Sequence, residues 1–333
     1  MLTAVFLHTS VSSHSNNSIY YQIIRRKAEF GVQPFCFNTE GVKVQPCIHR
    51  VKFSSEKGEH IMKMDMHCHT KEGSLDALAS MEEYVERLME LGYDGMMITD
   101  HNSYKGYENW LRVEKNIQAK LPEGKRFVVL KGIEYDTHNS GHMIIVLPDG
   151  VSSRIFEARG LSVEQLQKIV HELGGIIGPA HPYGNGYYAI MRTHKGKKHP
   201  EILEKFDFIE TFNGKTSLFG NNMADILAKR YNKPGIAGSD SHIMKDMGKV
   251  YTIFKEDINC NNDLIDYILA EKQIQVGGEA YKKLYRFYTK FVEKCGIGGY
   301  WVYNKVGTVY RTPARKRAKK EFRSKYGKVM VKQ

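Results

Sequence analysis

Two histidines separated by one residue are the first feature of this 333-residue chain that suggests chemistry. His67 and His69 end the strand-like run 61–66. Side chains two apart on a strand point to one face, so both imidazoles can reach one cation while Cys68 points away. A lone His-x-His pair is weak evidence, because surface and core histidines often have this spacing. The pair therefore needs support from the rest of the chain.

Five further clusters of metal-ligating residues each stand beside a short apolar run of strand length. A divalent ion takes several nitrogen and oxygen ligands, a carboxylate can bridge two ions, and this mixture suits zinc, manganese or iron. Polar residues at successive strand ends are typical of a barrel enzyme with a metal site at one face. The five clusters are Asp100-His101, Glu134, His142, His181 and Asp240-Ser241-His242.

Alternating strand and helix signals over 61–277 predict a barrel-like α/β domain. Ser80 with Glu83, and Ser162 with Gln165, form capping boxes that predict two helix starts. We expect strands at 61–66, 94–98, 127–133, 142–147, 175–179, 206–212, 235–238 and 273–276. We expect helices at 81–92, 104–119, 163–174, 217–231 and 263–271, the last capped by Asn262.

The two flanks differ from this domain. Residues 1–60 show no sustained period and are expected to be an N-terminal extension, or to precede a native start at Met62 or Met64. Residues 278–333 form a basic, aromatic extension, and its part 281–333 has 16 lysines and arginines against two acidic residues. Its pattern predicts a helix at 281–294, a hairpin-like strand at 300–309 and a poorly patterned stretch from 311.

The basic extension has three interpretations: a solvated end, a contact surface for RNA or DNA phosphates, or, more weakly, a membrane-surface segment. The nucleic-acid interpretation has aromatic stacking candidates in Tyr285, Phe287, Tyr300, Trp301 and Tyr303.

Cysteine content and hydropathy limit the classes of protein to which this chain can belong. The five cysteines are scattered, which argues against a disulfide framework and favours a reducing cytoplasm. No apolar run approaches the length of a membrane span, and the N-terminus lacks the basic region of a signal peptide. There is no Ser-His-Asp arrangement, Walker loop or dinucleotide fingerprint.

The ordered set of motifs resembles the PHP family, the phosphoesterase domain named for polymerase and histidinol phosphatase. The resemblance covers about 61–277 and implies a distorted (β/α)7 TIM-like barrel with a trinuclear metal site. Its motifs are Asp65-Met66-His67-Cys68-His69-Thr70, Thr99-Asp100-His101, Gly132-Ile133-Glu134, Gly141-His142, Ala180-His181-Pro182 and Gly238-Ser239-Asp240-Ser241-His242.

The resemblance also implies which residues hold each ion. The first ion takes His67, His69, Glu134 and Asp240; the second takes His101, His242 and an acid from the first loop; the third takes Glu134, His142 and His181. Glu134 would bridge, and we expect Glu134, His181 and Asp240 to act in catalysis. Many members have an aspartate where this chain has Ser74. We prefer Asp76 for the missing acid, from its register with the helix start at Met81, and keep Glu72 as the alternative.

Other polar residues have both structural and functional interpretations. We expect Asp100 to orient a ligand, and we expect His138 and His171 to be structural. Arg192 and Lys195 lie in a lysine-rich loop that is either solvated or a clamp for substrate phosphate. Asn213 ends a strand at the same rim, where it touches substrate or caps the next helix.

The sequence thus predicts a cytoplasmic, metal-dependent phosphoesterase in which up to three divalent ions activate a water as hydroxide. Its substrate is a phosphomonoester, a nucleotide or a nucleic-acid end. The alternatives are an amidohydrolase, a family that also opens with His-x-His but usually has a carbamylated lysine, and a non-catalytic nucleic-acid-binding protein.

Overall fold

The computed structural model describes residues 61–184, 186–280, 298–299, 301–303 and 305–326. The expected extension 1–60 and the expected helix 281–294 lie outside these residues. Within the described residues, no helix has the length and apolar character needed to cross a membrane.

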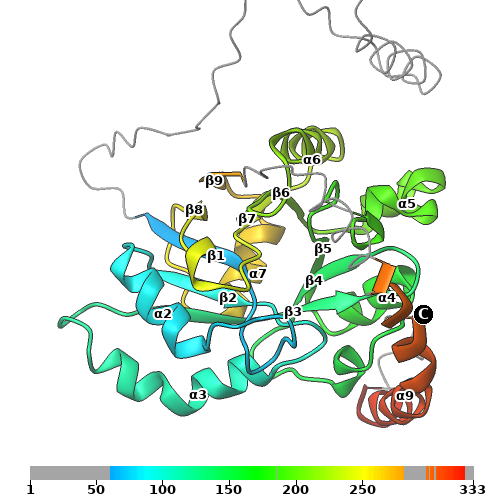
Figure 1. Ribbon diagram of the computed structural model, residues 1–333, viewed down its shortest axis with the longest axis horizontal. Coiled ribbons are helices and arrows are strands. Elements are labelled where there is room, and N and C mark those ends of the chain that lie inside the picture. Colours follow the sequence, from blue (N-terminus) through cyan, green and yellow to red (C-terminus); the bar gives the residue numbers. More distant parts are fainter. Residues whose placement is uncertain (1–60, 185, 281–297, 300, 304, 327–333) are drawn as a thin grey trace, which may run out of the picture. The chain divides into compact units, whose positions relative to one another are not determined.

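Seven strands, β1 to β7, surround the centre of the domain, and helices cover them on the outside (Figure 1). One sheet has the order β5-β4-β3-β2-β1-β8-β9, and a second sheet pairs β6 with β7. The strands are β1 (Met62–Cys68), β2 (Gly95–Ile98), β3 (Val128–Asp136), β4 (His142–Val146), β5 (Ile176–Pro179), β6 (Ile209–Asn213), β7 (Gly235–Gly238), β8 (Val250–Phe254) and β9 (Gln275–Gly278).

Backbone hydrogen bonds link the two sheets. The amide of Asp240 donates to the carbonyl of His67, and the amide of His69 donates to the carbonyl of Ser241, so β7 flanks the ligand-bearing end of β1. On the other side, the amide of Asp207 donates to Ile177 of β5. The ring of seven strands therefore closes as a barrel. Because β4 runs antiparallel to both of its neighbours, the barrel is distorted, as expected.

Local sequence signals explain where the main helices begin. Ser80 and Ser162 form the two predicted capping boxes, with Glu83 and Gln165 as reciprocal partners. Ser217 caps a third helix by accepting from the amide of Gly220. The described residues include the α-helices α2 (Met81–Glu90), α3 (Lys105–Gln118), α4 (Val163–Glu172), α5 (His194–Lys198), α6 (Leu218–Arg230), α7 (Asn261–Leu269) and α9 (Thr312–Tyr326).

Four sequence expectations need correction. Strand β8 was not predicted; it pairs antiparallel with the first half of β1, at Met62–Met64. Helix α7 begins after Cys260 instead of Asn262. Residues 301–303 and 305–309 are helical, so the predicted hairpin strand is wrong for them. The stretch expected to be poorly patterned contains α9.

Helix α9 packs on the barrel through a narrow stripe. Arg315, Ala318 and Phe322 are spaced along one face; Ala318 and Phe322 are buried, and both belong to the core cluster that contains Leu166 and Phe206. Because the stripe contains an arginine, the spacing of apolar residues alone does not reveal an amphipathic helix here. Part of the basic extension is therefore packed against the barrel domain.

Candidate metal centre

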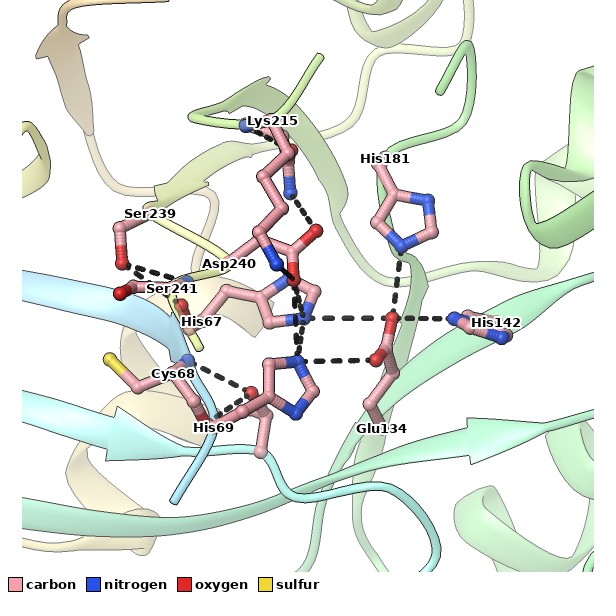
Figure 2. Close-up of polar contacts among 12 residues, drawn as sticks. His67, Cys68, His69, Glu134, His142, His181, Lys215, Ser239, Asp240 and Ser241 are labelled. Carbon is pink, nitrogen blue, oxygen red and sulfur yellow. Dashed lines mark hydrogen bonds and ion pairs between the residues drawn. The ribbon is translucent and has the colours of Figure 1, made fainter. Parts of the chain in front are cut away.

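The ends of the barrel strands bring the sequence-predicted ligands together (Figure 2). His67 comes from β1, Glu134 from β3 and His142 from the start of β4. His69, His101, His181, Asp240 and His242 follow the ends of strands β1, β2, β5 and β7. Four groups have ligand atoms close enough to share an ion. They are His67-His69-Asp240, His69-His101-His242, Glu134-His142-His181 and His101-Asp136-His142.

Glu134 lies between these groups. Its Oε1 is 3.0 Å from Nδ1 of His142 and 3.0 Å from Nε2 of His181. Its Oε2 is 3.0 Å from Nδ1 of His101 and 3.3 Å from Nε2 of His69. The side chain is almost completely buried. One carboxylate therefore faces histidines of three groups, which is the arrangement that a bridging ligand requires.

The first loop places Asp76 and Glu72 differently. Oδ2 of Asp76 lies 3.2 Å from Nε2 of His242 and 3.7 Å from Nε2 of His101. Oε2 of Glu72 instead accepts a hydrogen bond from the amide of Met81, at the start of α2. This geometry favours Asp76 as the acid of the second site.

Ser74 stands where the resemblance implies an aspartate, and it contacts two predicted ligands. Its hydroxyl donates to Asp100 and lies 3.2 Å from Nδ1 of His69, and it accepts from the amide of His101. Asp100 also accepts from the amide and hydroxyl of Thr70. Burial raises the pKa of Asp100 to about 6 even though these hydrogen bonds act to lower it. Asp100 thus orients His69 indirectly, through Ser74.

Three charged residues near the ligands were missed by sequence reasoning. Glu210 of β6 lies 2.9 Å from Nδ1 of His67, and Asp136 of β3 lies 3.1 Å from Nε2 of His142. The Lys215 ammonium contacts Nδ1 of His242 and lies 3.9 Å from Oδ1 of Asp240. The signal for Asp136 was its spacing: it stands two residues after Glu134 on one strand, hence on the same face.

The three predicted substrate-binding residues have different surroundings. Asn213 donates to Glu210 and to Oδ2 of Asp240, so it lies among the acidic residues of the centre. Lys195 pairs with Glu164 of α4. Arg192 is exposed at the end of a short 3₁₀ helix (Ile190–Arg192). Asn213 thus contacts a predicted ligand, and for Arg192 and Lys195 the phosphate role stays a prediction.

The two other histidines with structural expectations lie apart from the ligand groups. His171, within α4, pairs with Asp207 at 2.9 Å. His138 lies in the loop between β3 and β4 and its carbonyl accepts from Lys305. Both positions agree with a structural role.

Two predicted ligands have an unusual backbone conformation. His181 and Asp240 have φ values of 30° and 52°, in the left-handed region that non-glycine residues rarely adopt. Such conformations cluster at functional sites, where surrounding contacts hold them. Gly238 is required for close strand packing, because a Cβ there would lie 2.1 Å from the Cβ of His67. A side chain at 238 would push β7 away from the ligand-bearing end of β1.

Charge interactions decide the protonation of the buried ligands. Burial acts to raise the pKa of Glu134, but the charges of His142, His67 and His101 outweigh it and hold the pKa well below its ordinary value. Burial also opposes ionisation of Asp240, whose pKa is lowered overall by Lys215 and His67. For His69, burial and the charges of His242 and His101 lower the pKa well below its ordinary value. Two ionised carboxylates and a neutral imidazole are thus available as ligands.

The donor set fits divalent metal ions. Nε2 of His67 and Nε2 of His69 lie only 3.1 Å apart and converge with Asp240. Imidazole nitrogens and carboxylate oxygens, without thiolate, are the ligands that zinc, manganese and non-haem iron accept. Cys68 points into the core and its burial raises the thiol pKa, so it takes no part.

Comparisons with known proteins agree with this geometry. A family model described as PHP-associated matches residues 220–272. The chain is 24% identical over 176 residues to DNA polymerase III PolC-type from Streptococcus mutans, covering 48% of this chain and 12% of that protein. It is 35% identical over 95 residues to DNA polymerase/3′-5′ exonuclease PolX from Bacillus subtilis, covering 27% of this chain and 15% of that protein.

The crystal structure of PsfC from Pseudomonas syringae PB-5123 matches the fold with a TM-score of 0.50 at 16% identity. That match covers 66% of this chain and 93% of PsfC. By contrast, the chain spans only a small part of the two polymerases that it matches.

Proposed function

We propose that this chain, which belongs to the PHP family, is a metal-dependent phosphoesterase that holds up to three divalent ions. The observation that carries the proposal is the position of Glu134, with each carboxylate oxygen close to histidines of a different ligand group. The substrates that fit are a phosphomonoester, a nucleotide or the phosphorylated end of a nucleic acid.

Different residues would hold the ions, contact the substrate and orient the ligands in such a reaction. His67, His69, Glu134 and Asp240 would hold the first ion, His101, His242 and Asp76 the second, and Glu134, His142 and His181 the third, so that Glu134 bridges. Bound ions supply Lewis acidity, an activated water and charge compensation for the reacting phosphate. Lys215 adds a partly exposed positive charge beside Asp240, where it can contact a phosphate oxygen. Asn213 fixes the orientation of Asp240 by donating to it.

The first experiment compares the wild type with Glu134→Gln. An amide keeps the shape of the side chain but removes the charge that two ions would share, so we expect lower metal content and turnover reduced by orders of magnitude. Metal content is measured by elemental analysis and the fold by circular dichroism. Glu86→Gln, a surface carboxylate paired with Lys120, is the control. Full metal content with wild-type rates in Glu134→Gln contradicts the proposal.

A substrate panel separates this proposal from the amidohydrolase alternative. It contains p-nitrophenyl phosphate, histidinol phosphate, nucleoside bisphosphates, 5′-phosphorylated oligonucleotides and a set of amides, each tested with zinc, manganese and iron. Turnover of phosphate esters supports the proposal. Turnover of amides alone contradicts it and favours the amidohydrolase.

A nucleic-acid substrate is favoured by the charge on α9. With Ala318 and Phe322 buried against the barrel, its opposite face exposes Lys316, Arg317, Lys320 and Arg323. Lysine and arginine side chains on one helix face can contact successive phosphates, and such binding weakens steeply with salt. The polymerases that the chain resembles are named as DNA-synthesising enzymes, which agrees with this substrate class.

Replacing these four residues with alanine tests that role, because Arg315, Ala318 and Phe322 remain to hold the helix. We expect weaker binding of 5′-phosphorylated RNA or DNA. The slope of log K against log salt concentration should also become shallower, by about 0.7 for each lost contact with a single-strand phosphate. Hydrolysis of p-nitrophenyl phosphate stays near the wild-type rate. Unchanged affinity and salt dependence contradict the nucleic-acid role and leave a small phosphoester as the substrate. The cytoplasmic location remains part of the proposal and rests on the scattered cysteines.

A further inference from the structure

Asp136 is a buried carboxylate at the end of β3 that the predicted ligand set does not include. It is fully buried, and it stands two residues after Glu134. Its Oδ1 lies 3.1 Å from Nε2 of His142, and its Oδ2 lies 3.0 Å from Nη2 of Arg159. The two oxygens therefore face different partners: a predicted ligand and a guanidinium.

The two ring nitrogens of His142 also face different partners. Nδ1 lies 3.0 Å from Oε1 of Glu134, and Nε2 of His181 lies 3.0 Å from the same oxygen. An ion held by Glu134, His142 and His181 is therefore approached by Nδ1 of His142. Its Nε2 then carries the proton and faces Oδ1 of Asp136 at 3.1 Å, where a small turn of the ring aligns the N–H with this oxygen. A carboxylate that accepts from the far nitrogen of a ligating histidine fixes its tautomer and ring orientation and increases its basicity.

Arg159 connects Asp136 to the C-terminal segment 301–326. The Tyr303 ring centroid lies 4.7 Å from the centre of the Arg159 guanidinium, a cation–π contact. Arg315 of α9 donates to the carbonyl of Arg159 and, at 3.0 Å, to the carbonyl of Thr308. Both the guanidinium and the backbone of Arg159 are thus contacted from the same distant part of the chain. Figure 1 shows α9 on the side of the barrel that carries β4 and α4.

We propose that Asp136 is a positioning residue for His142 and that the C-terminal segment acts through Arg159 to hold it there. In this arrangement Arg159 occupies Oδ2 of Asp136 and directs Oδ1 towards His142. The C-terminal segment then contributes to the affinity of the third ion without touching that ion. This inference rests on the proposed metal centre, but it concerns metal affinity and not the reaction.

Metal titration tests the proposal without any phosphoester. Metal-free protein is titrated with Zn²⁺ against a competing chelator. We expect Asp136→Asn to weaken the binding of one equivalent by about 10- to 100-fold, the usual effect of losing such a partner, with the remaining Zn²⁺ binding unchanged. Arg159→Met is expected to weaken the same equivalent, and Arg159→Lys to recover part of the loss. Arg154→Ala, an exposed arginine five residues earlier, is the matched control.

The effect of the C-terminal segment is measured with Arg315→Ala. We expect this variant to weaken the same Zn²⁺ equivalent as Arg159→Met, and to add little when the two are combined, because both act through Arg159. Arg311→Ala, an exposed arginine one helical turn before Arg315, is its control. Wild-type Zn²⁺ affinity in Arg315→Ala overturns the role of the segment.

The tautomer of His142 gives a second, spectroscopic readout. In protein labelled with ¹⁵N-histidine and loaded with Zn²⁺, we expect Nδ1 of His142 to be metal-bound and Nε2 to be protonated. A metal-bound Nε2 would instead place the ion among His101, Asp136 and His142 and overturn the proposal. Unchanged Zn²⁺ affinity in Asp136→Asn, or loss of every equivalent together with a lower melting temperature, also overturns it. Failure of phosphoester turnover affects only the proposed function.

Discussion

Oε1 of Glu210 lies 2.9 Å from Nδ1 of His67, and both side chains are buried. A proton on Nδ1 is then donated to Glu210, which leaves the Nε2 lone pair directed towards His69 and Asp240. Glu210 also accepts from Asn213. Thus the histidine that begins the motif is oriented by β6, the strand that pairs with β7 in the second sheet.

Glu210→Gln keeps the size of the side chain and an acceptor oxygen but removes its charge. We expect Zn²⁺ affinity at the first site to fall by about 10- to 100-fold, because Glu210 no longer increases the basicity of His67. Chelator competition measures this loss. Glu204→Gln, an exposed acid six residues earlier, controls for the change of charge. Equal affinities in the two variants would exclude an orienting role.

Asp76→Ala and Glu72→Ala should have different effects. Asp76 faces His242 and His101, so its removal is expected to reduce turnover by orders of magnitude. Glu72 accepts from the first amide of α2, so its removal should cost about 0.5–2 kcal/mol of stability with turnover largely retained. Steady-state rates and melting temperatures distinguish the two. The reverse order would assign Glu72 to the second site.

The metal-free protein should lose stability as the pH rises. Burial alone lowers the pKa of His101, but Glu134, Asp136 and Asp76 outweigh it and raise the pKa to about 10. The stabilisation from the protonated ring is complete below the ordinary value of 6.5 and is lost as the pH rises through about 10. The expected loss is on the order of a few kcal/mol.

Urea unfolding of the metal-free protein at intervals from pH 6.5 to 10.5 measures this change. A bound ion requires a neutral ring, so the metal-loaded protein should lack this dependence on His101. His101→Gln should flatten the curve of the metal-free protein. A curve that stays steep in His101→Gln would assign the pH dependence to other groups.

Lys215→Gln should affect substrate binding more than metal binding. The Lys215 ammonium is partly exposed beside Asp240, where a substrate phosphate would also lie. We expect KM for a phosphomonoester to rise about tenfold, equivalent to about 1.4 kcal/mol, with metal content unchanged. Lys245→Gln, an exposed lysine in the next loop, is the control. A wild-type KM would remove Lys215 from the substrate site.

The sequence predicted those parts of the fold that local signals specify. Ser80 and Glu83 lie in one helical turn, so their capping box can be read from the chain alone. Strand β8 could not be read in this way, because its partner, Met62–Met64 of β1, lies nearly two hundred residues away. Helix α9 was missed because its inward-facing stripe includes Arg315, whose partners are the carbonyls of Arg159 and Thr308.

The difference between local and long-range signals also applies to the candidate metal centre. His67, His69 and Glu134 were recognisable from residue type, spacing and their place at strand ends. Glu210 and Asp136 contact predicted ligands as closely. Asp136 shares the two-residue spacing with Glu134 on β3, but no spacing marks Glu210, whose role shows only when its partner on β1 is known. Residues that orient ligands are therefore harder to predict than the ligands themselves.

Cys68 lies between His67 and His69 but faces the hydrophobic core near Met81 and Tyr84. It is completely buried, and burial raises the pKa of its thiol well above the ordinary value. Thiol reagents attack the thiolate, so an alkylating agent can reach this sulfur only when β1 separates from its surroundings. The strand that supplies two predicted ligands thus contains its own chemical reporter. At reagent concentrations where alkylation is faster than reclosing, the rate at which Cys68 is alkylated gives the frequency of opening at the candidate metal centre, and ions that bind the closed strand should slow it.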